Sequence, residues 1–170
     1  MTTTPETAAD SEARAHTASL IRDYYKAFNA GQSEAMLAFL TDDVIHDVNQ
    51  GERRHGLEKF RAFNARMDHH YKEDLKDIAV MVSKDGTRAA AEFNVHGTYR
   101  NTDEGLPPAS GQKYNLPAGT FFVIRDGKIA RVTTYYNLTE WITQVAGKSS
   151  LADRFLCFSP CSNVSCTGLS

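Results

Sequence analysis

The sequence is poor in cysteine, and its three cysteines, Cys157, Cys161 and Cys166, all lie near the C-terminal end. An odd number of cysteines cannot close into a complete disulfide framework within one chain. A structural zinc site normally has four ligands, and this end of the sequence offers no histidine beside the three cysteines. The sequence therefore predicts neither a disulfide-stabilised fold nor a zinc site in this region.

A charge excess of one sign and long apolar runs are also missing. The chain has 19 basic and 21 acidic residues, for a formal net charge of −2. A nucleic-acid-binding domain would be expected to carry a basic patch or stripe. No apolar run approaches the ~20 residues that cross a bilayer, and residues 1–10 lack the basic start and apolar segment of a secretory signal. We expect a cytoplasmic protein without nucleic-acid or membrane partners.

What the sequence does contain is sufficient for one folded domain. Its 170 residues are 41% hydrophobic and 24% charged, which is ordinary for a soluble protein with a core of its own. We assign residues 11–147 to a single domain. Residues 1–10 are expected to form a flexible leader, and residues 148–170, which contain the cysteines, a disordered tail outside the fold.

The first part of this domain has the spacing of helices. Apolar residues recur every three or four positions from Ser11 onward, and Gly31 ends the segment. A second, short helix is expected at residues 34–40 and a third at residues 57–71, which has an apolar stripe. Between these two helices, residues 43–49 alternate like a strand.

The remainder of the domain reads as strands. Residues 75–83 and 87–99 flank a first turn, and two long strands flank Asp126-Gly127, a pair that suits the positive φ angles of a two-residue hairpin. A loop at residues 101–110 separates the two hairpins, and a short helix is expected at residues 138–145. Helices followed by an antiparallel sheet predict an α+β fold.

Both faces of the last predicted hairpin are apolar. Phe121 and Val123 lie on one face, and Phe122, Ile124 and Ile129 lie on the other. A sheet with two apolar faces must be covered on both. The helices cover one face, so we expect a second copy of the chain to cover the outer face and form a homodimer.

Three short segments stand out: Phe28-Asn29-Ala30-Gly31, Leu40-Thr41-Asp42-Asp43-Val44 and His55-Gly56. With them the sequence resembles the nuclear transport factor 2 superfamily, which includes ketosteroid isomerase, SnoaL-like polyketide cyclases and limonene-1,2-epoxide hydrolase. The resemblance covers about residues 15–146, and residues 113–138 are similar to the C-terminal hairpin of limonene-epoxide hydrolase. It implies a cone-shaped cup, in which a curved antiparallel sheet carries three N-terminal helices on its concave face.

The resemblance also implies functional residues. Tyr24 falls where ketosteroid isomerase has its oxyanion-binding tyrosine, and Asp47 falls close to its general base. The position of that enzyme's second acid holds no carboxylate here. The terminal aspartate of the epoxide hydrolase falls at Asn137, and residues 91–97 contain no arginine or aspartate. The Asp-Arg-Asp set that activates water in the epoxide hydrolase is therefore absent.

His46 and Asp47 are the candidate general bases. An apolar pocket can move the pKa of an imidazole or a carboxyl group toward neutrality, as a general base requires. Neighbours on a strand point to opposite faces, so both can face a cavity only if a β-bulge intervenes. The alternation with Val44 and Val48 places His46 inward. Each also has a structural interpretation, His46 as a hydrogen-bonded core histidine and Asp47 as a solvated edge residue.

Tyr24 is the candidate hydrogen-bond donor to a ligand carbonyl, and a wider set is expected to line the ligand site: Asn49, Phe93, Val95, Phe121, Thr134, Tyr136 and Asn137. Asn137 fits equally well as the N-cap of the last helix, and Asn49 as part of a turn. No cofactor or metal is expected. The chain has no glycine-rich phosphate loop, and the adjacent His69 and His70 diverge on a helix.

Together these features predict an enzyme related to ketosteroid isomerase. It would use cofactor-free general acid–base chemistry, of the isomerase, cyclase or hydratase type, on a small apolar carbonyl compound. The alternative is a non-catalytic, dimeric ligand-binding or interaction module that uses the same cup. Epoxide hydrolysis is the third possibility.

Overall fold

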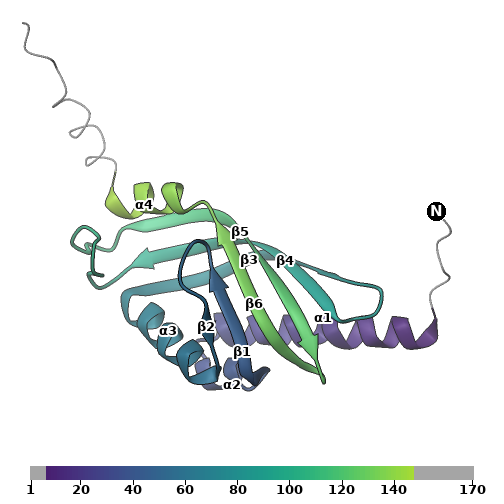
Figure 1. Ribbon diagram of the computed structural model, residues 1–170. Helices are drawn as coiled ribbons and strands as arrows, with labels where there is room; N and C mark the ends of the chain where they lie inside the picture. Colours follow the sequence, from purple (N-terminus) through teal and green to yellow (C-terminus); the bar gives the residue numbers. More distant parts are fainter. Residues whose placement is uncertain (1–6, 148–170) are drawn as a thin grey trace, which may run out of the picture.

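A curved six-stranded sheet with helices against its concave side forms the body of the protein (Figure 1). The computed structural model describes residues 7–147, so the predicted tail, its cysteines and most of the predicted leader lie outside the described residues. The elements are α1 (Ala8–Asn29), α2 (Ser33–Leu37), β1 (Leu40–Val48), β2 (Arg54–His55), α3 (Leu57–His70), β3 (Tyr71–Val82), β4 (Arg88–Tyr99), β5 (Lys113–Arg125), β6 (Lys128–Tyr136) and α4 (Leu138–Ala146).

The predicted α+β class is confirmed, with one correction to the sheet. The strand order is β2-β1-β6-β5-β4-β3, and β1 runs parallel to β6, with Val48 beside Thr134. The other pairs are antiparallel. The sheet is therefore mixed, whereas an antiparallel sheet was expected. The alternation of residues along β1 shows which faces it presents, but not the direction of its neighbour.

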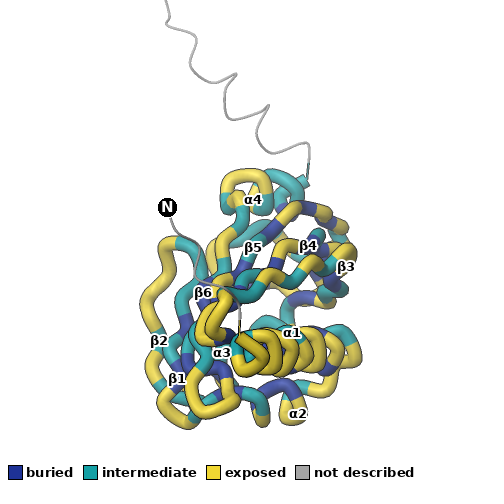
Figure 2. The backbone as a smooth tube through the Cα atoms, turned by 90° about the vertical axis from the view of Figure 1, so that its right-hand side faces the viewer, coloured by how far each residue is buried: buried dark blue, intermediate teal, exposed yellow. Residues whose placement is uncertain are grey.

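Helix α1 lies across the concave face and is attached near its middle and at its C-terminal end. Its outer side is exposed to solvent in Figure 2. The hydroxyl of Thr17 donates to the carbonyl of Gly86 in the β3–β4 turn at 2.8 Å. At the C-terminal end of α1, the side-chain amide of Asn29 exchanges two hydrogen bonds with the backbone of Leu75, both at 2.9 Å. These contacts fix the helix over the sheet.

Two element boundaries differ from the predicted ones for local reasons. Helix α1 begins at Ala8, earlier than expected, because Thr7 and Asp10 form a reciprocal capping box. Strand β3 begins at Tyr71, directly after α3, whereas a strand was expected only from Leu75. The helical period therefore changes to strand alternation with no intervening breaker residue.

The second hairpin forms as its sequence predicts. Asp126 and Gly127 have φ angles of 53° and 71°, both in the left-handed region that a two-residue turn of this kind requires. Phe122 on the inner face of this hairpin is buried. On the outer face Phe121 is 57% and Tyr135 52% exposed, so residues 7–147 leave these side chains uncovered.

The wide end of the cup is closed by α4. The side-chain amide of Gln144 is hydrogen-bonded to the backbone N–H and carbonyl of Asn115 at 2.8 and 3.0 Å, which fixes α4 on β5. Trp141 projects from this helix onto Tyr71, Tyr114 and Tyr136, with ring centroids 5.6, 6.0 and 6.3 Å away. A cluster of aromatic rings therefore forms one end of the interior.

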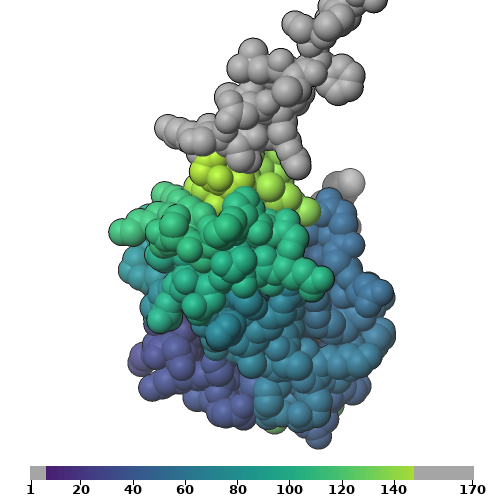
Figure 3. All heavy atoms as spheres, turned by 90° about the vertical axis from the view of Figure 1, so that its left-hand side faces the viewer, coloured from purple at the N-terminus to yellow at the C-terminus, as the bar shows by residue number. Residues whose placement is uncertain are grey.

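The loop between β4 and β5 is held against α3 by Asp103. Its carboxylate accepts hydrogen bonds from Arg66 at 2.6 Å and from the hydroxyl of Tyr71 at 2.9 Å. The hydroxyl of Tyr99 accepts from the Asp103 backbone N–H and donates to the carbonyl of Pro107. Figure 3 shows this end of the molecule, where the green β4–β5 segment lies between α4 and the blue helix α3.

Candidate functional site

An inner cavity of about 120 Å³ lies between α1 and the concave face of the sheet. Aromatic and aliphatic side chains form most of its wall, together with a few polar groups. Five residues that the sequence assigns to the site line it: Tyr24, Phe93, Val95, Thr134 and Tyr136. The remaining wall consists of Tyr25, Phe28, Glu73, Leu75, Ala118, Thr120 and Val132. Of these residues, only Glu73 carries an ionisable carboxyl group.

Glu73 belongs to the inward-facing row of β3, between Tyr71 and Leu75, both of which are buried. The hydroxyl of Tyr114 donates to the Glu73 carboxyl at 2.5 Å. Burial raises the pKa of this carboxyl above its ordinary 4.5; the Tyr114 hydrogen bond opposes that shift, and the negative charge of Asp68 adds to it. A carboxyl group with a raised pKa in an apolar cavity is suited to proton transfer near neutral pH.

The absence of a side chain at Gly97 makes this hydrogen bond possible. In the sheet register, Gly97 of β4 lies between Glu73 of β3 and Tyr114 of β5. A Cβ atom at Gly97 would be 2.0 Å from a carbon of the Tyr114 ring. The ring therefore lies directly over the glycine and spans one strand to reach the carboxyl group, a use of glycine typical of close approaches in sheets.

Two adjacent phenols of α1, those of Tyr24 and Tyr25, also line the cavity. Burial raises the pKa of both, so both remain protonated and able to donate hydrogen bonds at neutral pH. The Tyr25 hydroxyl is buried and has no hydrogen-bond partner among the described residues. The Thr120 hydroxyl lies near it but beyond hydrogen-bond distance, and is paired with Thr134 at 3.1 Å. A buried polar group without a partner is uncommon, and here it leaves a donor for a ligand.

His46 faces inward, as its alternation predicts, but it does not line the cavity. It packs under α3, stacked on Phe60 at 4.1 Å between ring centroids and edge-on to Phe63 at 4.8 Å. Burial, with a smaller contribution from the positive charge of Arg54, lowers the pKa of His46 to about 4. The packing corresponds to the core-histidine interpretation, but the predicted hydrogen bonding is not found at Nδ1, which is buried without a partner among the described residues.

Asp47 points to the opposite, outer face, so the structure separates the two candidate bases. Its carboxylate pairs with Arg53 at 2.7 Å and Arg131 at 2.8 Å, and it accepts a hydrogen bond from Thr133 at 3.3 Å. The hydrogen bond from Arg53 is the main cause of its lowered pKa. Asp47 is thus neither a solvated edge residue nor a cavity residue, but part of an ion-pair network on the outer face.

Three further residues expected at the ligand site lie outside the cavity wall. Asn137 caps α4 by accepting from the Glu140 backbone N–H at 3.1 Å, which is its alternative predicted use. Asn49 accepts from the Tyr136 backbone N–H at 3.0 Å and so holds the ends of β1 and β6 together. Phe121 faces outward because its neighbour Phe122 occupies the inner face.

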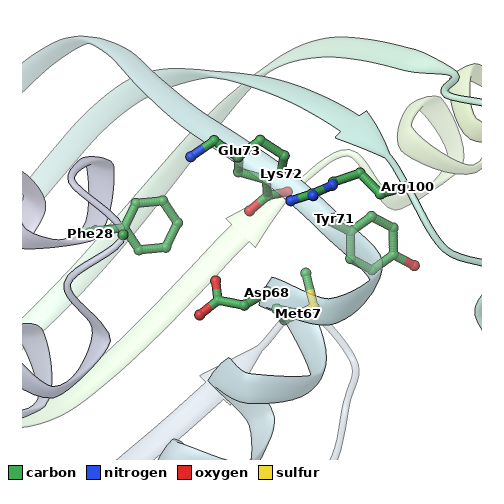
Figure 4. A pocket seen from close by; sticks show the side chains of 8 residues that line it. Phe28, Met67, Asp68, Tyr71, Lys72, Glu73 and Arg100 are labelled. Carbon is green, nitrogen blue, oxygen red and sulfur yellow. The ribbon is translucent and has the colours of Figure 1, made fainter.

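A second, outer pocket of about 240 Å³ adjoins the inner cavity, and Phe28 and Glu73 line both. In Figure 4 the carboxyl groups of Glu73 and Asp68 face each other across this pocket, and the guanidinium of Arg100 reaches in beside Glu73. Its other lining residues are Gly31, Met67, Tyr71 and Lys72. Glu73 therefore lies where the inner cavity meets the outer pocket.

Sequence reasoning missed Glu73 because it placed the start of this strand at Leu75. The available signal was the alternation Tyr71, Glu73, Leu75, which puts a carboxylate on an otherwise apolar inner row. Within residues 7–147, no group of three or more histidine, cysteine, aspartate or glutamate side chains is arranged to hold a metal ion. None of the helices described for this stretch has the length and apolar character needed to cross a membrane.

Comparison with known proteins identifies relatives. The SnoaL-like domain family matches residues 21–132. A candidate polyketide cyclase from Pseudomonas putida is 61% identical, with a TM-score of 0.73, covering 75% of this chain and 96% of that one. Another from Xanthomonas campestris is 55% identical, with a TM-score of 0.77, and the match covers 78% and 98% of the two chains. No curated protein matches the chain.

Proposed function

The chain belongs to the SnoaL-like domain family, and we propose that it is an enzyme in which Glu73 acts as general base on a small carbonyl compound. The family and the cyclase-named structures support a cyclase- or isomerase-type function on a small molecule. The observation that carries the choice of base is the Glu73 carboxyl in a tyrosine-lined cavity, with its pKa raised by burial.

The cavity contains the groups that enolisation needs. Glu73 would remove a proton from the carbon next to a carbonyl group, and the electron pair of that C–H bond would move onto the carbonyl oxygen. The hydroxyls of Tyr24 and Tyr25 would donate hydrogen bonds to the resulting oxyanion. Returning the proton from Glu73 to a different carbon completes an isomerisation. In a cyclisation, the enolate carbon would attack a second carbonyl, and Glu73 would return its proton to the alkoxide oxygen that forms.

The dimensions of the site favour a small reacting group. The inner cavity, at about 120 Å³, is below the roughly 300–1,000 Å³ typical of sites for drug-sized ligands. A large ligand would have to extend into the outer pocket past Glu73. The reacting carbonyl group would therefore enter first, between the two tyrosines and the carboxyl group.

A direct test uses 3-cyclohexen-1-one, a small ketone whose conversion into the conjugated 2-cyclohexen-1-one is followed by ultraviolet absorbance. We expect the wild-type protein to accelerate this isomerisation and Glu73→Gln to reduce kcat by roughly 10²-fold or more, because the base is lost. Glu92→Gln is the matched control, since Glu92 is an exposed glutamate of β4, outside the cavity wall. It should retain wild-type kcat.

The pH dependence gives a second readout of the same assignment. Because a base must be deprotonated to act, kcat/KM should fall as the pH decreases through the raised pKa of Glu73. Full activity in Glu73→Gln would overturn this assignment. Binding of the ketone without turnover, in the wild type and in both variants, would favour the alternative of a non-catalytic binding module.

The structure gives His46 and Asp47 packing and ion-pair roles, so neither enters the proposed mechanism. The homodimer remains part of the proposal, supported by the exposed apolar side chains Phe121 and Tyr135 on the outer face. A cytoplasmic location also remains a proposal.

A further inference from the structure

We propose that the ligand of this site carries an acidic group, a carboxylate in the simplest case, which Arg100 binds in the outer pocket with Lys72 in support. This inference rests on the proposed function for the orientation of the ligand. It adds a substrate class, that of amphipathic oxo-acids, with the carbonyl end in the inner cavity and the acid at its entrance.

The backbone places Arg100 firmly. Its N–H donates to the carbonyl of His70 at 2.8 Å, and the next residue, Asn101, donates from its side chain to the carbonyl of His69 at 2.6 Å. The start of the β4–β5 loop is thus attached to the end of α3. From this fixed point the guanidinium reaches into the outer pocket beside Glu73 (Figure 4).

The positive charges of Arg100 and Lys72 are not paired with an acidic side chain of the described residues. Among residues 7–147, neither the guanidinium of Arg100 nor the ammonium of Lys72 makes a hydrogen bond or ion pair. The neighbouring Arg66, in contrast, is paired with Asp103 at 2.6 Å. A planar guanidinium without a partner at a pocket can bind a carboxylate through two parallel hydrogen bonds.

The one opposing charge on the far wall is held away from Arg100. The carboxylate of Asp68 accepts hydrogen bonds from Ser33 at 2.9 Å and Asn64 at 3.4 Å, both on the side of α2 and α3. The Glu73 carboxyl is itself engaged, because it accepts the hydrogen bond from the hydroxyl of Tyr114. An acidic ligand group therefore has the guanidinium of Arg100 available in this pocket, with Lys72 elsewhere on its wall and the Asp68 carboxylate tied to its own partners.

The residues that line both the inner cavity and the outer pocket determine how such a ligand would be oriented. Because Phe28 and Glu73 line both spaces, a molecule whose carbonyl group lies beside Glu73 continues past Phe28 into the outer pocket. Its distal end then comes within the space that Arg100 and Lys72 line. A compound that is apolar at the carbonyl end and anionic at the other would complement both spaces.

Isothermal titration with a matched pair of probes tests this directly. 4-Oxo-4-phenylbutanoate and its primary amide share the aryl ketone and differ only in the charge of the distal group. We expect the wild type to bind the carboxylate at least about tenfold more tightly than the amide, with a preference that weakens as salt rises. Arg100→Gln should abolish the preference, and Arg100→Lys should keep part of it.

Lys59→Gln is the control, because Lys59 is an exposed lysine of α3 outside both spaces and its loss should leave the preference unchanged. Equal affinity of the wild type for the two probes, or an unchanged preference in Arg100→Gln, would overturn the proposal. Repeating the titration with Glu73→Gln separates the proposed role of Glu73 as base from the proposed binding of an acidic group by Arg100. A preserved charge preference there, with no isomerase activity in the wild type, would reject Glu73 as base while retaining the acid-binding pocket.

Discussion

Tyr114 and Glu73 are joined by a hydrogen bond that crosses an entire strand, from β5 over Gly97 of β4 to β3. The tyrosine is the donor, so the bond stabilises the ionised carboxylate. It therefore lowers the pKa of a group that burial otherwise raises. This balance would set the pH at which Glu73 becomes a base.

Replacing Tyr114 by phenylalanine removes that donor while keeping the ring. The pKa of Glu73 should then rise further, because burial is no longer opposed by the hydrogen bond. The acid limb of the kcat/KM profile for 3-cyclohexen-1-one should move to higher pH. A limb that stays in place in Tyr114→Phe would show that another group controls it.

Gly97→Ala should disturb the same bond by a steric route. The added Cβ would be 2.0 Å from the Tyr114 ring, so the ring must move away from Glu73. We expect a loss of about 1–3 kcal/mol in the free energy of unfolding, as for other overpacked interiors. Chemical denaturation measures it, and Gly119→Ala is the control, because a Cβ there has its nearest contact at an ordinary 3.7 Å.

His46 should make the fold sensitive to acid. Its pKa is about 4 in the folded chain against an ordinary 6.5, so between these values the unfolded chain binds the proton and the folded chain does not. The contribution of neutral His46 to the free energy of unfolding is therefore fully present above pH 6.5. It is lost progressively as the pH falls toward 4, by about 3 kcal/mol in total. Denaturation of the wild type and His46→Phe across this range measures the difference. The His46→Phe variant should lack this loss of stability between pH 6.5 and 4. If the free energy of unfolding depends on pH in the same way in both proteins, His46 is not its cause.

Asp47→Asn distinguishes a structural from a catalytic Asp47. The change weakens the pairing with Arg53 and Arg131, so Tm should fall by roughly 2–4 °C. The kcat for 3-cyclohexen-1-one should stay at the wild-type value, because the carboxylate faces away from the cavity. A decrease in kcat comparable to that of Glu73→Gln would return Asp47 to the active site.

Phe121→Asp tests the proposed homodimer. A charge placed among the exposed apolar side chains of the outer face should prevent a second sheet from packing there. Sedimentation analysis should show a dimer for the wild type and a monomer for this variant. Ile142→Asp alters another exposed apolar residue, on α4, and should remain dimeric. A wild-type monomer at all concentrations would exclude the dimer.

Most of the fold follows from patterns that are local in sequence. The alternation of Ala89, Ala91, Phe93 and Val95 is reproduced as a buried inner row, and Asp126-Gly127 forms the expected turn. The parallel pairing of β1 with β6, in contrast, does not follow from a local pattern. It joins residues that are far apart in the chain, and no local period encodes it.

The sequence predicts which residues of the candidate site face inward. It does not predict which of these inward residues reach the cavity, because that depends on how the helices pack on the sheet. Tyr24 and Val95 reach the cavity because their inward faces lie between α1 and the sheet. His46 also faces inward, but β1 lies under α3, where Phe60 fills the space. Glu73 was overlooked because nothing in the residues around Tyr71 marks the change from helix to strand.

Trp141 is the only tryptophan of the 170 residues, and its ring lies against Tyr71, Tyr114 and Tyr136. Indole fluorescence of the unlabelled protein therefore originates from one position, next to the residues that surround Glu73. Its wavelength and intensity should respond to ligand entry and to rearrangement of these rings. The protein thus contains its own optical reporter, through which occupancy of the site can be followed in real time.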